Sequence, residues 1–385
     1  MLGSWTRLAA VPLAWAALAP ASAADLIVSA QDGKFFRVEG RATFPESPPA
    51  DSLVVVDASR FPPVVRTTVE SGIEHTVQGP PQAVAITPDG KLAIVAAPTR
   101  YDYAAKKELF DNFVQVVDLE ASPPAVARVD VGAHTNGLTI NRAGTLLLAA
   151  AHDGTVKVLT IEGKTVKLSS QVKVGEKRLS GIQFMPDGKS AIVALRDENG
   201  AAVLAIDGTN VTLTRERIAT GVNPYAIDVS SDGRWAVIGN TGVNRTVDDA
   251  DVVTLVDVGK RPFRAVQQIS VAATPEGVAI SPDGRWIAVS SMSGSNLLAD
   301  DPGRHKLGKV ALYEIRDGSA TKVSELPGGE AAQGVVFTQD SKTVIVQFDV
   351  ERALALYAVR DGRLVDTGER IKLAAGPVSI RSMPR

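Results

Sequence analysis

The chain contains no cysteine among its 385 residues. It therefore cannot form a disulfide or a thiolate metal site, and it cannot carry haem attached through cysteines. The chain also lacks an excess of either charge, with 41 Lys and Arg against 43 Asp and Glu and a formal net charge of −2. A nucleic-acid partner calls for a clustered basic surface, so we expect none.

Beyond its first residues the chain has no long apolar run. Arg7 precedes an apolar run over residues 8–19, and Ala21-Ser22-Ala23 matches the cleavage pattern of a secretory signal. The run of about 12 residues is shorter than the roughly 20 that a transmembrane helix needs. We therefore expect a cleaved signal peptide over residues 1–23, a single domain over residues 24–385, and a periplasmic or secreted protein without a membrane span.

What the chain does have is an internal repeat. In each unit an apolar run of period two is followed by a tight turn, often Pro-Asp-Gly or Ser-Asp-Gly, and by a second apolar run. Such a turn between two β-rich runs is typical of a hairpin, in which glycine supplies the positive φ. Two further strands follow each hairpin, and the last is the more polar, as an outer edge strand should be. The six units begin at Ala83, Gly137, Gly181, Ala226, Gly277 and Gly334.

A seventh unit can be assembled from the two ends of the chain. Residues 377–380 repeat the first-strand pattern, and apolar runs from Leu26, Ser52 and Val64 supply the other three strands. We therefore predict an all-β fold, a seven-bladed β-propeller of four-stranded antiparallel blades whose ring is closed by N- and C-terminal strands sharing one blade. A closed ring leaves few free edges, so we expect a monomer. We interpret residues 44–49 as a Pro-rich connector.

The turn and third-strand patterns carry a family resemblance. The S/T-P-D-G turn after the innermost strand, with third strands such as Val116-Val117-Asp118 and Leu255-Val256-Asp257, resembles the bacterial seven-bladed propellers of the YVTN-repeat and lactonase-like group. The resemblance covers essentially the whole mature chain. It implies a propeller from a group that holds sugar-lactone hydrolases, secreted surface proteins and relatives of redox-protein propellers. No matched motif carries a catalytic residue, so no role is transferred.

Three insertions are expected at one end of the ring. They lie at residues 98–112, 240–251 and 291–309, after second strands, where successive loops share a face. Long polar loops on a rigid scaffold are the usual place for binding. The alternative is that the insertions arose by drift and have no function. We predict that this face binds a protein or a small polar ligand. Candidates from its loops are Tyr101 and Tyr103, in a segment expected to contain a short helical turn, with His152, Asn244, Arg245 and His305.

The entry to each blade places a residue at the mouth of the central channel. These residues are Gln82, Asn136, Ser180, Tyr225, Glu276, Gln333 and Gly376. Most can form hydrogen bonds, so the ring suits a small polar ligand or a column of trapped water.

Some of these residues would also suit catalysis. His134 titrates near neutral pH and could act as a general base, with Glu276 as its partner. Arg178 or Arg245 could stabilise a developing oxyanion. A base for water and a cation for the oxyanion are the groups that lactone opening needs. The alternative is that His134 and His152 simply form loop hydrogen bonds. We favour a non-catalytic exported binding scaffold without a cofactor, and keep lactone hydrolysis and service in a periplasmic redox system as alternatives.

One acidic loop is a weak candidate for a metal. Asp248, Asp249 and Asp251 are carboxylates, the ligands that Ca²⁺ prefers. Their spacing differs from that of an EF-hand loop. We therefore predict a solvated acidic loop and no metal site.

Overall fold

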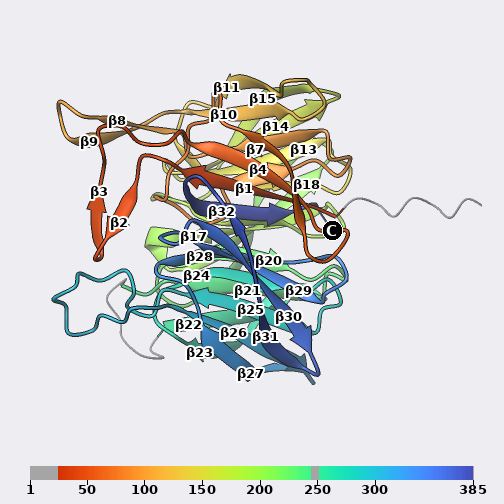
Figure 1. The fold of residues 1–385 in the computed structure, drawn as a ribbon. Coiled ribbons are helices and arrows are strands. Elements are labelled where there is room, and N and C mark those ends of the chain that lie inside the picture. Colours follow the sequence, from red (N-terminus) through yellow and green to blue (C-terminus); the bar gives the residue numbers. More distant parts are fainter. Residues whose placement is uncertain (1–24, 244–250, 385) are drawn as a thin grey trace, which may run out of the picture.

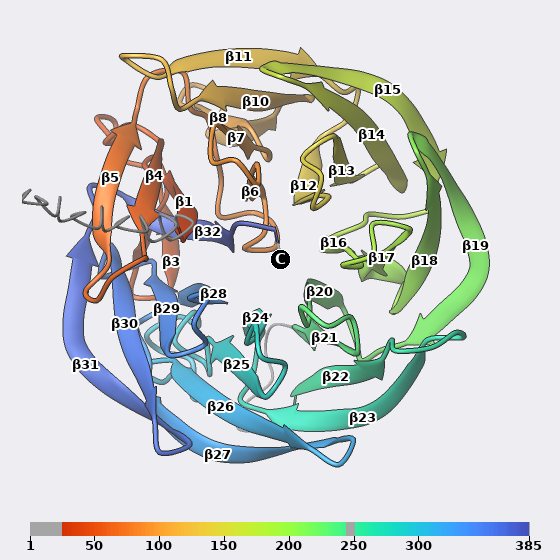
Figure 2. The same cartoon turned by 90° about the vertical axis from the view of Figure 1, so that its right-hand side faces the viewer.

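The computed structural model describes residues 25–243 and 251–384, which form seven four-stranded antiparallel sheets arranged as blades around an axis (Figures 1 and 2). The prediction of a seven-bladed propeller is confirmed. The signal peptide expected over residues 1–23 lies outside the described residues. In the described part of the chain no helix has the length and apolar character needed to cross a membrane.

The blades follow the chain order. Blade 1 consists of β6 (Val84–Ile86), β7 (Leu92–Val95), β10 (Phe113–Asp118) and β11 (Ala125–Asp130), and blade 2 of β12 (Thr135–Ile140), β13 (Leu146–Ala151), β14 (Thr155–Glu162) and β15 (Thr165–Lys173). Blade 3 consists of β16 (Ile182–Phe184), β17 (Ser190–Leu195), β18 (Gly200–Asp207) and β19 (Asn210–Ala219), with the 3-10 turn η1 (Arg196–Glu198) between β17 and β18. Blade 4 consists of β20 (Pro224–Val229), β21 (Trp235–Asn240), β22 (Asp251–Asp257) and β23 (Arg264–Val271), and blade 5 of β24 (Pro275–Ile280), β25 (Trp286–Ser291), β26 (Lys309–Arg316) and β27 (Ser319–Pro327). Blade 6 consists of β28 (Ala332–Phe337), β29 (Thr343–Phe348), β30 (Ala353–Arg360) and β31 (Arg363–Lys372), and blade 7 of β32 (Gly376–Ser382), β1 (Leu26–Asp32), β4 (Ser52–Asp57) and β5 (Val64–Val69).

Each sheet is buried on both faces because it is packed between two neighbours. In β13, Leu147 packs against blade 1, while Leu146 and Leu148 pack against blade 3. Successive side chains of a strand point to opposite faces, so the second strand of a blade reads as a continuous apolar run. The turn glycines behave as predicted: Gly90 has a φ of 70° and its N–H donates to the carbonyl oxygen of Thr87 at 2.9 Å.

The two ends of the chain close the ring. β32, the last strand, pairs with β1, so that Ser29 lies opposite Ile380 and Ile27 opposite Ser382. β4 pairs with the other edge of β1, and β5 completes the blade. Val378 and Ile380 are fully buried. The predicted shared blade is confirmed.

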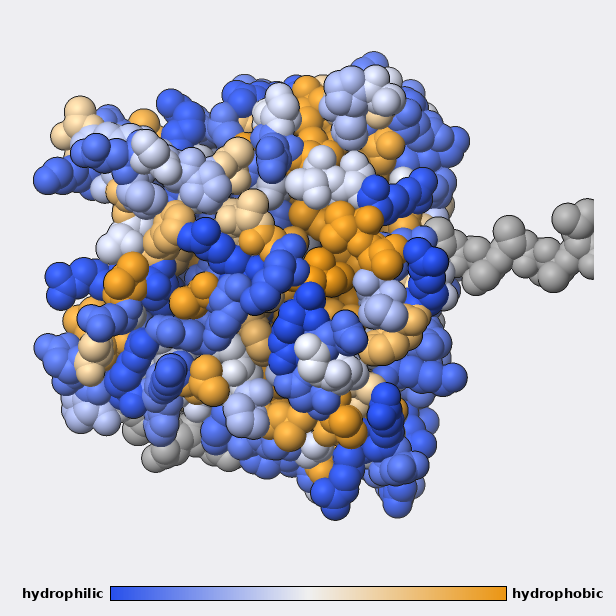
Figure 3. Space-filling view, viewed as in Figure 1, coloured by the Kyte–Doolittle hydropathy of each residue, from blue (hydrophilic) through white to orange (hydrophobic). Residues whose placement is uncertain are grey.

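The insertions at residues 98–112 and 291–309 project from one end of the ring, on the left in Figure 1. The insertion at residues 98–112 forms a hairpin of β8 (Thr99–Asp102) and β9 (Lys107–Phe110), not the short helical turn that we expected. A further insertion, residues 33–51 between β1 and β4, forms the hairpin of β2 (Phe36–Val38) and β3 (Arg41–Thr43). The sequence suggested only a Pro-rich connector there. Figure 3 shows that this end is largely polar, with scattered apolar side chains on its loops.

Candidate functional site

A cavity of about 330 Å³, called the mouth cavity here, opens on the ring axis at the insertion-bearing end. Blades 2 to 6 and the insertions at residues 33–51 and 292–308 contribute to its wall. The predicted residues that line it are Asn136, Arg178, Tyr225, Glu276 and Gln333. Side chains that the sequence did not single out complete it, chiefly Phe35, Arg37, Gln78, Arg196, Met292 and Asn296.

Gln82 closes the floor of this cavity instead of facing a ligand. Its Nε2 donates to the carbonyl oxygen of Ile227 at 2.7 Å, and its Oε1 accepts from the N–H of Ile227 at 2.9 Å. The side chain therefore bridges blades 1 and 4 across the axis. A Cβ at Gly181 would lie 2.9 Å from Gln82 Oε1 and 2.2 Å from the carbonyl oxygen of Tyr225. Only glycine lets the inner strands approach so closely here.

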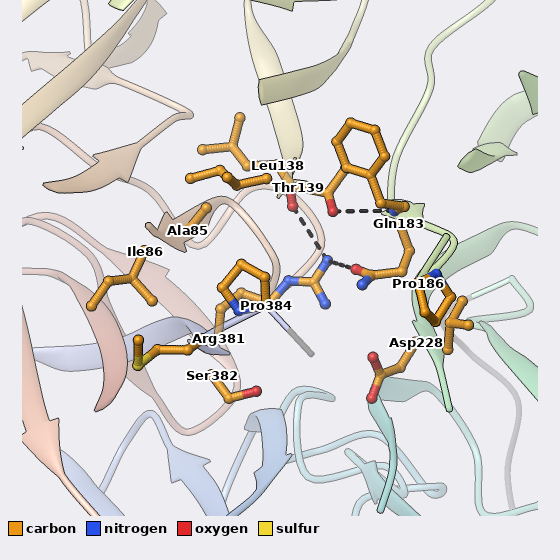
Figure 4. A pocket seen from close by; sticks show the side chains of 14 residues that line it. Ala85, Ile86, Leu138, Thr139, Gln183, Pro186, Asp228, Arg381, Ser382 and Pro384 are labelled. Carbon is orange, nitrogen blue, oxygen red and sulfur yellow. Dashed lines mark hydrogen bonds between the residues drawn. The ribbon is translucent and has the colours of Figure 1, made fainter. Parts of the chain in front are cut away.

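The far end of the axis is closed by the C-terminal tail, which Figure 2 shows at the centre of the ring. Arg381 donates to Gln183 Oε1 at 2.7 Å (Figure 4). It also donates to the carbonyl oxygen of Ile182 at 3.1 Å. The cavities left at this end and in mid-channel measure only about 50 and 20 Å³. These volumes hold a few water molecules at most. The mouth cavity is therefore a blind cup.

The hairpin of β2 and β3 forms one side of the cup and reaches the insertion of blade 5. The carbonyl oxygen of Glu39 accepts from the N–H of Ala299 at 3.1 Å. Arg37 Nη1 donates to the carbonyl oxygen of Asn296 at 3.4 Å. Gly40 has a φ of 79°, and a Cβ there would lie 1.8 Å from the Leu297 carbonyl oxygen. The two insertions thus meet, backbone to backbone, at the rim.

Three arginines bring positive charge into the cup. Arg37 comes from β2, Arg196 from η1 and Arg178 from the loop before β16. Among the described residues, no partner is found for the buried Nε atoms of all three or for Nη1 of Arg196. These four atoms are covered by the protein around them, while the arginine side chains to which they belong line the cup.

Neighbouring groups hold Arg178 and Arg196 in place. Arg178 Nη2 bonds Asp197 Oδ1 at 3.1 Å. The guanidinium of Arg196 lies over the ring of Tyr225, 4.2 Å from its centre, and its Nε is 4.0 Å from Asp197 Oδ1. The latter distance is too long for a hydrogen bond. Burial raises the pKa of the Tyr225 hydroxyl, so this side chain stays neutral beneath the cation.

Glu276 is the acid of the cup. Burial raises its pKa from 4.5 to about 7, against the opposing effect of Arg196 and Arg37, which favour the charged form. Its side chain therefore changes charge near neutral pH, inside a cavity lined by cations. A carboxyl group with such a pKa can accept or donate a proton at physiological pH.

Asp349 follows β29 in blade 6 and lines a smaller pocket together with Arg37. Burial raises its pKa from 3.8 to about 7, while the charge of Arg37 works in the opposite direction. Its Oδ2 is buried and finds no hydrogen-bond partner in residues 25–243 and 251–384. Arg37 thus feels two buried carboxyl groups that ionise near neutral pH.

His134 and His152 lie beside the cup, and neither lines it. Their rings meet edge to face with centres 4.7 Å apart, and Phe110 packs on His134 at 4.9 Å. His134 Nδ1 lies 3.0 Å from the carbonyl oxygen of Asp111, and burial lowers its pKa. His152 Nε2 lies 2.7 Å from Asn136 Nδ2. The structure thus brings Glu276 into the cup and leaves His134 outside it.

The other predicted residues are spread around the rim. Tyr101 stacks on Phe44 with ring centres 3.9 Å apart, and the Tyr103 hydroxyl donates to the carbonyl oxygen of Pro45 at 2.8 Å. These contacts join the two hairpins. Ser180 Oγ donates to the carbonyl oxygen of Pro224 at 2.7 Å, and His305 is exposed on the blade 5 insertion.

The acidic loop is described only in part. Asn244, Arg245, Asp248 and Asp249 lie outside the described residues. Asp251 Oδ2 accepts from the N–H of Thr274 at 2.7 Å, so this carboxylate braces the start of blade 5. Within the described ranges, no cluster of three or more His, Asp or Glu is arranged to hold a metal ion.

Two of the three arginines were missed for different reasons. Arg37 stands in the alternating run Phe36-Arg37-Val38, and a Glu39-Gly40 turn follows it, which is a hairpin signal that we did not use. Arg196 directly follows the buried strand β17. Its sequence position predicts exposure at a loop, and only the packed ring shows that this loop turns toward the axis.

The comparisons with known proteins identify the fold alone. No protein-family model matches the chain, and no curated protein matches it. Solved structures do. A putative 6-phosphogluconolactonase from Bacteroides uniformis matches with a TM-score of 0.69 at 14% identity, covering 94% of this chain and 100% of that one.

Two other solved structures are also similar. A putative 6-phosphogluconolactonase from Bacteroides fragilis has a TM-score of 0.67 at 16% identity, covering 95% of this chain and 99% of that one. Hydrazine synthase from Kuenenia stuttgartiensis has a TM-score of 0.61 at 20% identity, covering 80% and 91%. The likeness is one of fold alone. Lactonase-like propellers are thus among its structural neighbours.

Proposed function

We propose that this chain is an exported binding protein whose mouth cavity holds a small anionic ligand. The observation that supports it is the convergence of three arginines, Arg37, Arg178 and Arg196, on the wall of this cavity. A carboxylate or phosphate would bind their guanidinium groups with charge-assisted and often bidentate hydrogen bonds.

The shape of the cavity favours a small ligand over a protein segment. The cup is closed below by Gln82 and flanked by the β2–β3 hairpin, and its volume is about 330 Å³. Pockets for small molecules usually measure about 300–1,000 Å³ and fix the ligand by a few polar groups. A ligand of a few carbon atoms with one or two acidic groups would fill it.

Isothermal titration calorimetry on mature protein tests this proposal. The probes are gluconate, citrate, hexanoate and inorganic phosphate. We expect at least one to bind, and Arg196→Met to weaken it about tenfold or more, because charge-assisted hydrogen bonds are lost. Arg234→Met is the matched control: Arg234 also lies over an aromatic ring, 5.2 Å from the centre of Trp235, but in a turn at the other end of the blade. Lack of binding by every probe, or equal loss in both variants, contradicts the proposal.

We also propose that the protein acts outside the cytoplasm. The signal pattern of residues 1–23 supports this. Mass spectrometry of protein from the periplasmic fraction of a bacterial host should find an N-terminus at Ala24. Recovery of the uncleaved chain in the cytoplasm would contradict it.

Lactone hydrolysis is the second candidate, and Glu276 is the observation that favours it. A buried carboxyl with a pKa of about 7, beside Arg196 and Arg37, pairs a base for water with cations for an oxyanion. Lactone hydrolysis would also agree with the resemblance of the sequence to the YVTN-repeat and lactonase-like group. Hydrolysis of aldonolactones by wild type, lost in Glu276→Gln, would support it. Turnover that is unchanged in Glu276→Gln, or absent in wild type, rejects it.

A further inference from the structure

The positive charge of the cup is divided between two sides of the ring axis. Arg178 precedes β16 and Arg196 follows β17, so both belong to blade 3, and we call them the blade 3 arginines. Arg37 belongs to β2, which pairs with β3 in the hairpin. Figure 2 shows β3 and β17 on opposite sides of the axis. Cations therefore reach the cup from two opposite directions.

The buried groups around the cup show the same division. Burial raises the pKa of the Tyr225 hydroxyl, and the charges of the blade 3 arginines oppose this shift. Burial raises the pKa of Asp349 to about 7, and there the largest opposing charge is that of Arg37. Burial also raises the pKa of Glu276 to about 7, where Arg196 and Arg37 both oppose it. Glu276 therefore lies within electrostatic range of both sides of the cup.

Neighbouring groups hold the two sides apart. An ion pair with Asp197 and the ring of Tyr225 fix the blade 3 arginines. Arg37 Nη1 donates to the carbonyl oxygens of Asn296 and Gly40 at 3.4 and 3.5 Å, which fixes it on the other side. A carboxylate that binds one guanidinium bidentately uses both of its oxygens. A ligand with one acidic group therefore neutralises one side of the cup and leaves the other without an anion.

The charge and the wall of the cup favour two carboxylates over two phosphates. Asp197 already neutralises one of the blade 3 arginines, so the charges of Arg196 and Arg37 remain for a ligand. Two carboxylates match these two charges, whereas two phosphates would carry about three to four negative charges at pH 7. Phe35 and Met292 also line the cavity and offer apolar contacts for methylene groups between the acids.

We propose that the cup selects a small dicarboxylate, whose acidic groups bind the blade 3 arginines at one end and Arg37 at the other while its hydrocarbon chain crosses the axis. This inference rests on the proposed anion binding and adds the number and placement of the acidic groups. A monocarboxylate of the same length forms only one of these two sets of charge-assisted hydrogen bonds.

Calorimetry on the mature protein at pH 6, where Glu276 is largely protonated, tests this selection. The probes are adipate and its monomethyl ester, which share the same chain and differ by one charge, with hexanoate as a second monocarboxylate. The flexible chain of adipate lets its carboxylates span a range of separations. We expect adipate to bind at least about tenfold tighter than either monocarboxylate, because it alone binds both sides of the cup.

Two variants show whether the acidic groups bind separately. Arg37→Met and Arg196→Met should each weaken adipate binding about tenfold and bring it close to that of the monomethyl ester. The ester, bound on one side, should respond to at most one of the two variants, and Arg234→Met should change neither affinity.

The outcomes distinguish this inference from the proposed anion binding. Equal binding of adipate and its ester by wild type, or a preference for adipate that persists in either variant, overturns the inference while anion binding stands. The wild-type comparison decides the matter even if a variant fails to fold. Failure of every anion to bind to wild type overturns both proposals.

Discussion

At the scale of single residues, the ionisation of Glu276 sets the charge of the cup. Protonated Glu276 leaves Arg37 and Arg196 free to attract an anion, whereas ionised Glu276 neutralises part of their charge and repels the ligand. Because the pKa of Glu276 is about 7, its charge changes within the pH range of ordinary binding experiments. Asp349, whose pKa is also raised to about 7, changes its charge in the same pH range and also acts on Arg37. Anion binding should therefore be linked to proton uptake.

The expected result is an affinity that falls as pH rises. Between pH 6 and pH 8 the protonated fraction of a group with a pKa of about 7 drops about tenfold, so adipate should bind about tenfold more weakly at pH 8. Calorimetry at both pH values measures this. Glu276→Gln should flatten most of the dependence. The same slope in wild type and variant would show that another group is responsible.

Asp349 gives a prediction about stability. Its folded pKa lies above the ordinary value, so the ionised form opposes folding: the cost is absent below pH 4, grows with pH and is complete above pH 7. Asp349→Asn should therefore raise the free energy of unfolding by about 2–4 kcal/mol at pH 8 and change it little at pH 4. Urea denaturation at both pH values checks this. Asp207→Asn, at an exposed position, is the control and should have no such effect. A gain at both pH values alike would contradict the argument.

The ring of mouth residues could be predicted from the sequence because each inner strand begins with the same pattern. That pattern placed Asn136, Tyr225, Glu276 and Gln333 on the axis. It could not show that Gln82 spans the floor, because the bond to Ile227 joins blades that are far apart in the sequence. The arginines of the cup come from loops, whose direction depends on how the blades pack.

At the scale of elements, the strands inside the repeat were predictable and those in the insertions were not. A strand packed between two sheets is apolar throughout, and the repeat marks where it starts. The strands β2 and β3 have three residues each and stand next to a Pro-rich stretch, so their only local signal is one short alternating run with the Glu39-Gly40 turn. Their hairpin is stabilised by contacts with distant residues, Ala299 and Asn296, that local sequence does not reveal.

Removal of this hairpin should separate binding from folding. Phe36 and Thr43 pair across the hairpin, so their neighbours Phe35 and Phe44 lie close enough for a Gly-Ser-Gly linker to replace residues 36–43. The variant should unfold at nearly the wild-type urea concentration, because the blades are intact. It should bind adipate at least about tenfold more weakly, since Arg37 and one wall of the cup are gone.

The matched control is the other hairpin. Replacing residues 104–106 at the tip of β8 and β9 alters the insertion-bearing end, but it removes no side chain that lines the cup and keeps Tyr101, Tyr103 and Glu108, which contact the other hairpin and Gln78. Binding should be close to wild type. If both variants lose binding alike, the cup is not the place where the ligand sits.

At the scale of the whole molecule, the shared blade makes the ring depend on its last strand. Without β32, blade 7 would lose its inner strand, and β1 would expose the edge that now pairs with residues 376–382. The same strand carries Arg381, which closes the far end of the axis. The fold and the blind shape of the cup therefore depend on one short segment at the C-terminus.

Truncation after Ala375 tests this dependence. Burial of Val378 and Ile380 contributes roughly 1.5–3 kcal/mol each, so loss of β32 should lower the free energy of unfolding by at least about 3 kcal/mol, and the freed edge of β1 should promote association. Urea denaturation and size-exclusion chromatography measure the two effects. Truncation after Met383 keeps the pairing of β1 and β32 and the bond from the Met383 N–H to the carbonyl oxygen of Leu26, so it should behave as the full chain does. Equal stability of both truncated proteins would mean that the ring does not need its closing strand, and that contacts within and between the other blades are sufficient for stability.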